Sequence, residues 1–211
     1  MYFLAFEGLD GSGKSSLMKK LEAELTQRKQ AYIQTREPGG TGLGDKLRDL
    51  ILEKSNPPPV PRAELLMYEA SRAQHVEELI RPQLAQKKWV LSDRFSASSL
   101  AFQGHARGLG WETVGQLNDF ATGGLYPDLT ILLDLTVEES ERRRTHRQQT
   151  LQVEADRIES ENRAFHEKVR QGFLRAAAES PQNWLVLDAS ETVETLFTQL
   201  MTELKKRKWL N

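Results

Sequence analysis

The residues with the clearest chemical potential lie in one loop near the N-terminus. Residues 8–15 read Gly-Leu-Asp-Gly-Ser-Gly-Lys-Ser and match the phosphate-binding pattern G-x-x-x-x-G-K-[ST] at every fixed position. Glycines let backbone N–H groups turn inward around an anion, and a helix that follows adds the positive end of its dipole. Lys14 would place its charge on the β- and γ-phosphates, and the Ser15 hydroxyl is a ligand for Mg²⁺. The loop therefore predicts a nucleoside triphosphate site made by Gly8, Leu9, Asp10, Gly11, Ser12, Gly13, Lys14 and Ser15.

Such a loop needs a carboxylate on the other side of the metal, at the end of a neighbouring strand. Asp93 closes the apolar run 89–92, and Asp134 follows the apolar run 129–133. Either aspartate could instead cap a turn or a helix. We favour Asp93 as the metal ligand, with Ser15, because Arg94 follows it and would face the same cleft.

Five short apolar runs predict the strands that position these groups: residues 2–6, 31–36, 89–92, 129–133 and 184–187. Leucines at helical spacing predict helices over 13–28 and 42–54. Further helices are expected over 62–87, 97–103, 111–122, 137–147, 157–178 and 192–208. Pro82 should kink the third helix or end it early, and the polar residues 148–155 should be mobile. Strands that are apolar on both faces and alternate with helices indicate an α/β fold of three layers, a five-stranded parallel sheet covered by helices.

Composition limits the function classes further. At 211 residues the chain suits one domain, over 1–211, and its net charge of −1 predicts no nucleic-acid surface. The absence of cysteine excludes disulfides and thiolate chemistry. No apolar run approaches the ~18 residues of a membrane helix, and Glu7 interrupts the N-terminal run too early for a secretory signal. We therefore expect a soluble, cytoplasmic protein without a membrane partner.

The phosphate loop alone does not separate a kinase from an ATPase, a GTPase or a motor. Further blocks do: Thr35 to Thr41 (T-R-E-P-G-G-T), then Asp93 to Phe95 with Ser98 to Gly104, and Asp156 to Glu159 (D-R-I-E). Together with the loop, they resemble thymidylate kinases over essentially the whole chain. The resemblance implies a P-loop kinase fold, transfer of the γ-phosphoryl group of MgATP to dTMP without a covalent intermediate, and a homodimer packed through helices on one face.

The resemblance also assigns roles in the acceptor site. Arg36, Arg48 and Arg94 match the arginines that clamp the acceptor phosphate, and planar guanidinium groups suit a dianion. Tyr68 matches the aromatic ring that stacks on thymine, and Arg72, one turn later, matches the group that hydrogen-bonds the base. Without the resemblance, Tyr68 would be interpreted as core, and a solvated helix position would remain the alternative for Arg48. The remaining matches are Asp10 at the sugar 3′-hydroxyl, and Pro38, Ser98, Ser99, Phe102 and Gln103, with the Phe102 ring where a ribose 2′-hydroxyl would clash.

A basic run, Arg142 to Arg147, precedes the last of these blocks. Such a run is usually a solvated helix face, but phosphoryl transfer needs extra positive charge from a segment that closes. Thymidylate kinases supply it from the phosphate loop or from a lid, and here Gly11 and Ser12 occupy the loop position. The resemblance thus implies a lid at about 142–157, with Arg147 as first candidate. Arg142 is the second candidate, or a residue on the adenine side of ATP. The catalytic set is then Lys14, Asp93, Arg94 and Arg147.

Two alternatives remain. The nearest is another P-loop nucleotide kinase with a different acceptor. The other is a regulatory protein that hydrolyses nucleotide slowly; one of the GTPase kind would carry a base-reading N-K-x-D sequence, and this chain has none.

Overall fold

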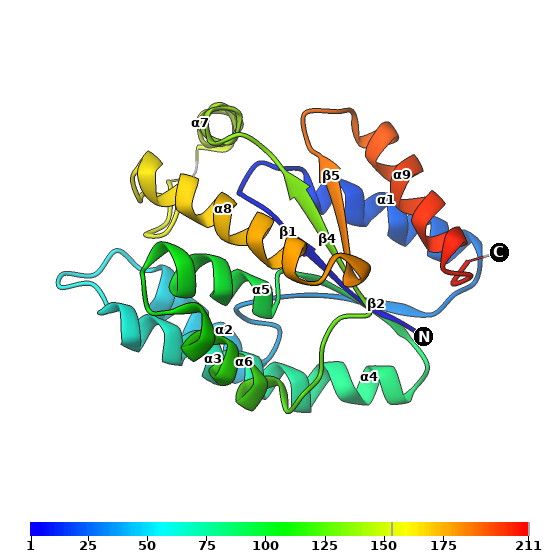
Figure 1. Cartoon of the computed structure of the whole chain (residues 1–211), viewed down its shortest axis with the longest axis horizontal. Coiled ribbons are helices and arrows are strands. Elements are labelled where there is room, and N and C mark those ends of the chain that lie inside the picture. The colour runs from blue at the N-terminus through cyan, green and yellow to red at the C-terminus, as the bar shows by residue number, and fades with distance from the viewer. Residues whose placement is uncertain (153, 211) are drawn as a thin grey trace.

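A five-stranded, all-parallel sheet forms the centre of the computed structural model, which describes residues 1–152 and 154–210 (Figure 1). The strands are β1 (Phe3–Glu7), β2 (Tyr32–Arg36), β3 (Trp89–Asp93), β4 (Leu129–Asp134) and β5 (Trp184–Asp188), in the order β2-β3-β1-β4-β5. The predicted α/β class and sheet are thereby confirmed. β1 lies between β3 and β4, so the chain leaves β1 at the point where the strand order reverses, which is where open parallel sheets bind ligands.

Strand register brings three of the predicted motifs to one edge of the sheet. Phe6 of β1 is level with Asp93 of β3, and Arg36 of β2 is level with the same aspartate. The phosphate loop, the turn after Arg36 and the turn after Asp93 therefore emerge side by side.

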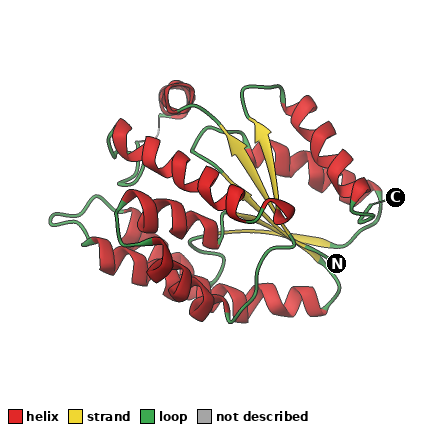
Figure 2. Ribbon diagram, viewed as in Figure 1, coloured by secondary structure: helices red, strands yellow, loops and turns green. Residues whose placement is uncertain are grey.

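Two helices cover one face of the sheet, α1 (Lys14–Gln27) and α9 (Val193–Lys206), and they lie together in Figure 2. Their leucines form one core cluster with alternate residues of β1 and β4: Leu17, Leu21, Leu25, Leu196, Leu200 and Leu204 pack with Leu4, Phe6, Ile131 and Leu133. Phe3 and Ala5 face the opposite side and join another cluster. Burial on both faces is the reason that most residues of β1 and β4 are apolar.

The opposite face carries most of the other helices. They are α2 (Gly42–Leu52), α3 (Pro61–His75), α4 (Arg81–Ala85), α5 (Ser96–Ser99), α6 (Trp111–Thr122) and α8 (Arg163–Glu179). Two π-helical segments interrupt them, η1 (Val76–Ile80) between α3 and α4, and η2 (Leu100–Ala106) after α5. α8 packs closely on η2, where Phe102 and Phe173 meet edge to face.

Some predicted boundaries are wrong. The helix α7 (Val137–Leu151) includes four residues that we expected to be mobile, and Val153 of the expected lid lies outside the described residues. α8 begins at Arg163 rather than at Arg157, because the side chain of Asn162 caps it by accepting from the N–H of Phe165 at 2.9 Å. The interruption expected near Pro82 is confirmed, since η1 ends just before it. Within the described ranges, no helix combines the length and the apolar character that crossing a membrane requires.

Candidate active site

The loop between β1 and α1 has the geometry of an anion cradle. Gly8, Gly11 and Gly13 have φ values of 133°, 81° and 96°, and a Cβ at Gly8 would lie 2.5 Å from the carbonyl oxygen of Leu133. Only glycine fits such a turn. Among the described residues no side chain caps α1, so its first N–H groups stay free for a ligand. Lys14 Nζ is held in the loop by the carbonyl oxygens of Gly8 and Leu9, at 3.1 and 3.2 Å.

Two pockets adjoin this loop. The first, here called the phosphate pocket, is lined by Gly11, Gly13, Lys14, Ser15, Arg36, Asp93, Arg143 and Arg147. The second, called the aromatic pocket, is lined by Pro38, Leu52, Tyr68, Arg72, Ser98, Phe102, Gln103, Asp156 and Ile158. Asp10, Glu37, Arg48 and Arg94 line both. The two pockets therefore meet at a boundary of two carboxylates and two guanidinium groups.

Arg94 occupies that boundary in an unusual backbone conformation, with φ of 73°. Its Nη2 donates to Asp10 Oδ1 at 2.8 Å, and Nη1 lies 3.9 Å from Glu7 Oε2. Burial alone would lower the pKa of Arg94, but these carboxylates raise it above its ordinary value. Likewise, burial would raise the pKa of Asp10, but Arg94 and Lys14 hold it well below its usual range. The backbone of Arg94 is in the left-handed region, and its guanidinium group is paired with both Glu7 and Asp10. With 15% of its side chain exposed, Arg94 is therefore held in position before an anionic ligand binds.

Beneath Arg94 lies a buried carboxylate that sequence analysis did not single out. Glu7 has no exposed surface and accepts from the N–H of Phe95 at 2.8 Å, and from the N–H and the hydroxyl of Ser98 at 3.2 and 2.7 Å. Burial raises its pKa to about 7 against the opposing charge of Arg94. A charged residue directly between the apolar run 2–6 and Gly8 of the phosphate loop was the available signal.

Asp93 and Ser15 both line the phosphate pocket, as expected of the metal ligands. Asp93 Oδ1 is buried and accepts no hydrogen bond from any group in the described part of the chain. A buried carboxylate oxygen without a donor is costly unless a cation binds it, so this pair fits a divalent ion held partly by phosphates. The described residues contain no cluster of three or more His, Cys, Asp or Glu side chains that could hold a metal alone. Asp134 is engaged elsewhere, by Arg170 in a bidentate pair at 2.7 and 2.8 Å.

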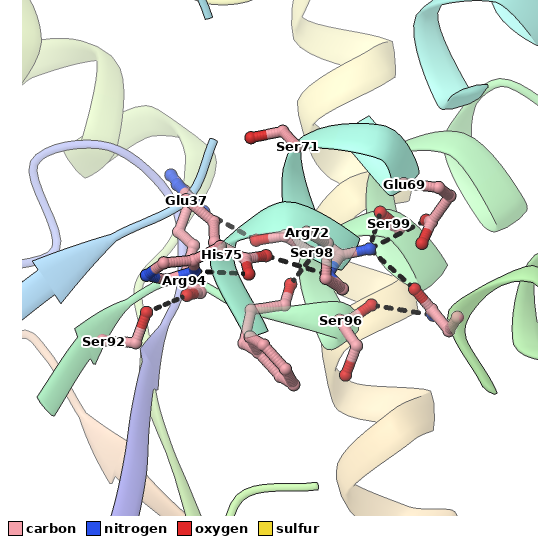
Figure 3. A network of polar contacts seen from close by, with 12 residues as sticks. Glu37, Glu69, Ser71, Arg72, His75, Ser92, Arg94, Ser96, Ser98 and Ser99 are labelled. Atoms are coloured by element: carbon pink, nitrogen blue, oxygen red, sulfur yellow. Dashed lines mark hydrogen bonds and ion pairs between the residues drawn. The ribbon is translucent and has the colours of Figure 1, made fainter. Parts of the chain in front are cut away.

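Arg72 lies at the centre of a polar network between the two predicted acceptor segments (Figure 3). Its side chain is 1% exposed and donates to Glu37, Glu69, Asn118 and Ser99 at 2.8 to 3.0 Å, and to the carbonyl oxygen of Phe95 at 3.3 Å. The last of these bonds uses Nη2, and no second acceptor for Nη2 lies among the described residues, so its other N–H is left for a ligand in the aromatic pocket. Ser99 lies behind Arg72 and not at the pocket wall, although we expected it to contact the acceptor.

The other acceptor residues also converge. Tyr68 and Phe102 line the aromatic pocket, where burial raises the pKa of Tyr68 above its ordinary value. Arg48 Nη1 donates to the carbonyl oxygen of Pro38 at 3.0 Å, and Glu37–Pro38 is a cis peptide. Arg36 reaches the phosphate pocket with 59% of its side chain exposed.

Of the lid arginines, the structure brings Arg147 to the phosphate pocket and leaves Arg142 outside its wall. Arg142 is 71% exposed and paired with Glu139. Sequence analysis missed Arg143, which lines the pocket and approaches the carbonyl oxygen of Gly11 at 3.4 Å. It lies one turn before Arg147 on the same face of α7, so that spacing could have identified it. A Cβ at Gly11 would lie 3.1 Å from the Arg143 Cβ, so the small loop residue lets α7 pack closely.

Comparisons with known proteins agree with this geometry. A profile of the thymidylate kinase family matches residues 6–200. A thymidylate kinase of Bdellovibrio bacteriovorus is 58% identical over 210 residues, which cover 100% of this chain and 98% of that protein. Thymidylate kinases of Lactobacillus acidophilus and Thermosipho melanesiensis are 45% and 47% identical, over 98% and 94% of this chain and 94% of each relative.

Proposed function

Because the chain belongs to the thymidylate kinase family and thus phosphorylates dTMP to dTDP for dTTP synthesis, we propose that its two adjoining pockets hold the two substrates of that reaction. ATP binds with its phosphates in the phosphate pocket, and dTMP binds with its base in the aromatic pocket. The observation that carries this assignment is the shared boundary formed by Asp10, Glu37, Arg48 and Arg94. An in-line transfer needs donor and acceptor phosphates to meet at one point, and this boundary is the one place common to both pockets.

Each side chain then has a role that its surroundings support. Lys14 binds the β- and γ-phosphates, while Arg36, Arg48 and Arg94 clamp the acceptor phosphate. Tyr68 stacks on the thymine ring, Arg72 donates to it from Nη2, and Asp10 reaches the sugar 3′-hydroxyl. Pro38, Ser98, Phe102 and Gln103 complete the contacts with the acceptor, and Ser99 supports Arg72 from behind.

The reaction requires positioning and charge rather than a strong base, since the attacking atom is already a phosphate oxygen. Arg94 holds that oxygen towards the γ-phosphorus and neutralises the charge that repels it. Arg143 and Arg147 add positive charge over the transferring group from α7. Ser15 and Asp93 would hold Mg²⁺, which, when bound, supplies charge neutralisation on the donor phosphates.

At the level of the whole chain, residues 1–211 act as one domain with a lid at about 142–157. We place the enzyme in the cytoplasm. Its partner is a second copy of the chain, because α2, α3 and α6 are neighbours and carry exposed apolar side chains: Leu50 (55%), Leu66 (57%) and Phe120 (87%). Side chains of this size and exposure on adjacent helices are typical of an interface.

Steady-state kinetics of two variants test the assignment of the pockets. Lys14→Ala should raise the KM for ATP and lower kcat at least about a hundredfold, because it removes the charge on the donor phosphates. Tyr68→Ala should raise the KM for dTMP about tenfold or more with little change in the KM for ATP, because it removes a stacking contact. A reversed pattern, or equal effects on both KM values, would contradict the assignment.

A further inference from the structure

One buried carboxylate outside the pocket walls connects three segments of the acceptor side. Glu64, in the first turn of α3, is 1% exposed. Its oxygens accept from Gln103 Nε2 at 2.9 Å, from Arg107 Nε and Nη2 at 3.2 and 3.1 Å, and from Arg157 Nη1 at 2.7 Å. The partners come from η2, from Arg107 directly after it and from the D-R-I-E turn, so a single side chain joins η2 to that turn.

The charge of Glu64 determines how the amide of Gln103 is turned. Burial alone would raise the pKa of Glu64, but the hydrogen bonds from Gln103 and Arg107 outweigh it and lower the pKa below its ordinary value. An ionised carboxylate only accepts hydrogen bonds, so the NH₂ group of the amide must face it. The carbonyl oxygen of Gln103 then has to point away from Glu64. The oxygen and nitrogen of an amide side chain look alike in shape, but the hydrogen bond to an ionised carboxylate fixes which of them faces Glu64.

The Oε1 atom of Gln103 is available to a ligand in the aromatic pocket. Gln103 lines the aromatic pocket, and within residues 1–152 and 154–210 no group donates to its Oε1. Arg72 lines the same pocket and keeps one Nη2 hydrogen for a ligand. A donor and an acceptor in one pocket match the O4 and N3–H of thymine or uracil. Cytosine presents the opposite pattern, an amino donor at C4 and an acceptor at N3.

We propose that Glu64 is a positioning residue for base selection: it holds the Gln103 amide so that Oε1 accepts the N3–H of a 4-oxopyrimidine and rejects a 4-aminopyrimidine. The proposal rests on the proposed function, which puts the base of the acceptor in the aromatic pocket. Discrimination of this kind is strong when the wrong base leaves buried polar groups unpaired. Glu64 acts only through Gln103 and does not touch the nucleotide.

The test measures dissociation constants of dTMP and dCMP by calorimetry for the wild type, Gln103→Leu, Glu64→Gln and the double variant. Gln103→Leu should reduce the preference for dTMP over dCMP by about tenfold or more, the effect of one lost hydrogen bond to a buried group. Glu64→Gln should reduce the ratio too, because a neutral amide no longer dictates which end of Gln103 faces it. In the double variant the ratio should equal that of Gln103→Leu alone, since Glu64 has nothing left to orient.

Glu161→Gln is the matched control. Glu161 pairs with Arg107 at 2.6 Å, so its substitution disturbs the same arginine cluster. Within the described ranges, no hydrogen bond joins Glu161 to Gln103. Its dTMP:dCMP ratio should stay at the wild-type value. An unchanged ratio in Gln103→Leu overturns the proposal, as does Glu64→Gln weakening both nucleotides equally or adding to the effect of Gln103→Leu. If Glu64→Gln does not fold, Glu64→Asp replaces it: the shorter carboxylate keeps the negative charge beside Arg107 and Arg157 but draws back from Gln103, so the dTMP:dCMP ratio should again fall, and an unchanged ratio overturns the proposal.

Phosphorylation of dTMP by the wild type is measured alongside. If the wild type neither phosphorylates nor binds dTMP, the proposed function itself is contradicted. If the wild type turns over dTMP normally but the dTMP:dCMP ratio is unaltered in the Gln103 and Glu64 variants, only the proposed role of Glu64 is contradicted.

Discussion

At the scale of single residues, the centre of the site is a row of acidic and basic side chains that alternate in space and begin at the end of β1. Glu7 ends β1, Arg94 lies above it, and Asp10 of the loop lies beyond Arg94. Glu7 also accepts the backbone N–H of Phe95 and of Ser98, so it holds the turn that gives Arg94 its positive φ. The position of the arginine at the boundary of both pockets thus depends on a carboxylate that the substrates do not reach.

This burial predicts a pH-dependent contribution of Glu7 to stability. Its pKa is about 7 in the folded protein against 4.5 for an ordinary glutamate, so between these values the folded state holds a proton that the unfolded state lacks. Its contribution is therefore fully present below pH 4.5 and is lost as the pH rises through 7. The free energy of unfolding of the wild type relative to Glu7→Gln should fall by about 3 kcal/mol across this window. Urea denaturation from pH 4.5 to 8 measures it, and a constant difference would contradict it.

Arg143 and Arg142 both pair with Glu139 but differ in their access to the phosphate pocket, which makes them a matched pair. Arg143 lines the phosphate pocket, whereas Arg142 is 71% exposed and lies outside the pocket wall. Arg143→Ala should lower kcat by about a hundredfold, because a cation over the transferring phosphoryl group stabilises its charge in the transition state. Arg142→Ala should change kcat less than about threefold. Comparable losses of kcat in both variants would contradict the prediction that only a lid arginine at the pocket wall contributes to catalysis.

At the scale of elements, the contact between α8 and η2 fixes the segment that carries Phe102 and Gln103. A Cβ at Gly172 of α8 would lie 2.8 Å from the Cα of Ala101, a backbone atom that cannot move aside alone. Gly172→Ala should therefore destabilise the protein by about 1–3 kcal/mol through overpacking and should raise the KM for dTMP by displacing η2.

Gly115→Ala in α6 is the control for that substitution. A Cβ there meets nothing within 4 Å in the described part of the chain, so alanine should stabilise by about 0.5–1 kcal/mol through helix propensity. Thermal unfolding and dTMP kinetics of both variants provide the measurement. Equal behaviour of the two alanines would mean that close packing of α8 on η2 does not limit the acceptor site.

Sequence alone predicted what is local. The phosphate loop, the five strands and the interruption near Pro82 depend on residues that are adjacent in the chain, and they were found. The start of α8 was missed because Arg157 is held instead by α2: its N–H and its Nε donate to the carbonyl oxygens of Leu52 and Ile51, at 3.1 and 2.8 Å. Arg143 and Glu64 were missed for the same reason, since their roles require knowing which helix packs against which pocket.

At the scale of the whole molecule, the exposed apolar face of α2, α3 and α6 predicts a dimer in solution. Phe120→Asp should give a monomer, because a charge at the centre of an apolar interface is costly to desolvate while the 87% exposed position does not affect the fold. Tyr126→Ser, at a 49% exposed position outside these helices, should stay dimeric. Sedimentation velocity at micromolar concentration distinguishes these results, and a monomeric wild type would contradict the proposed interface.

The central claim is that two adjoining pockets transfer the γ-phosphoryl group of ATP to dTMP. A coupled assay of ADP release with dTMP, dUMP, thymidine, dCMP, AMP and GMP as acceptors tests it most directly, with Arg94→Ala as the inactive reference. We expect dTMP to give the highest kcat/KM of the panel and the Arg94→Ala rate to be near background. An equal or higher kcat/KM with any other acceptor, or ATP turnover that dTMP does not stimulate, would contradict the claim.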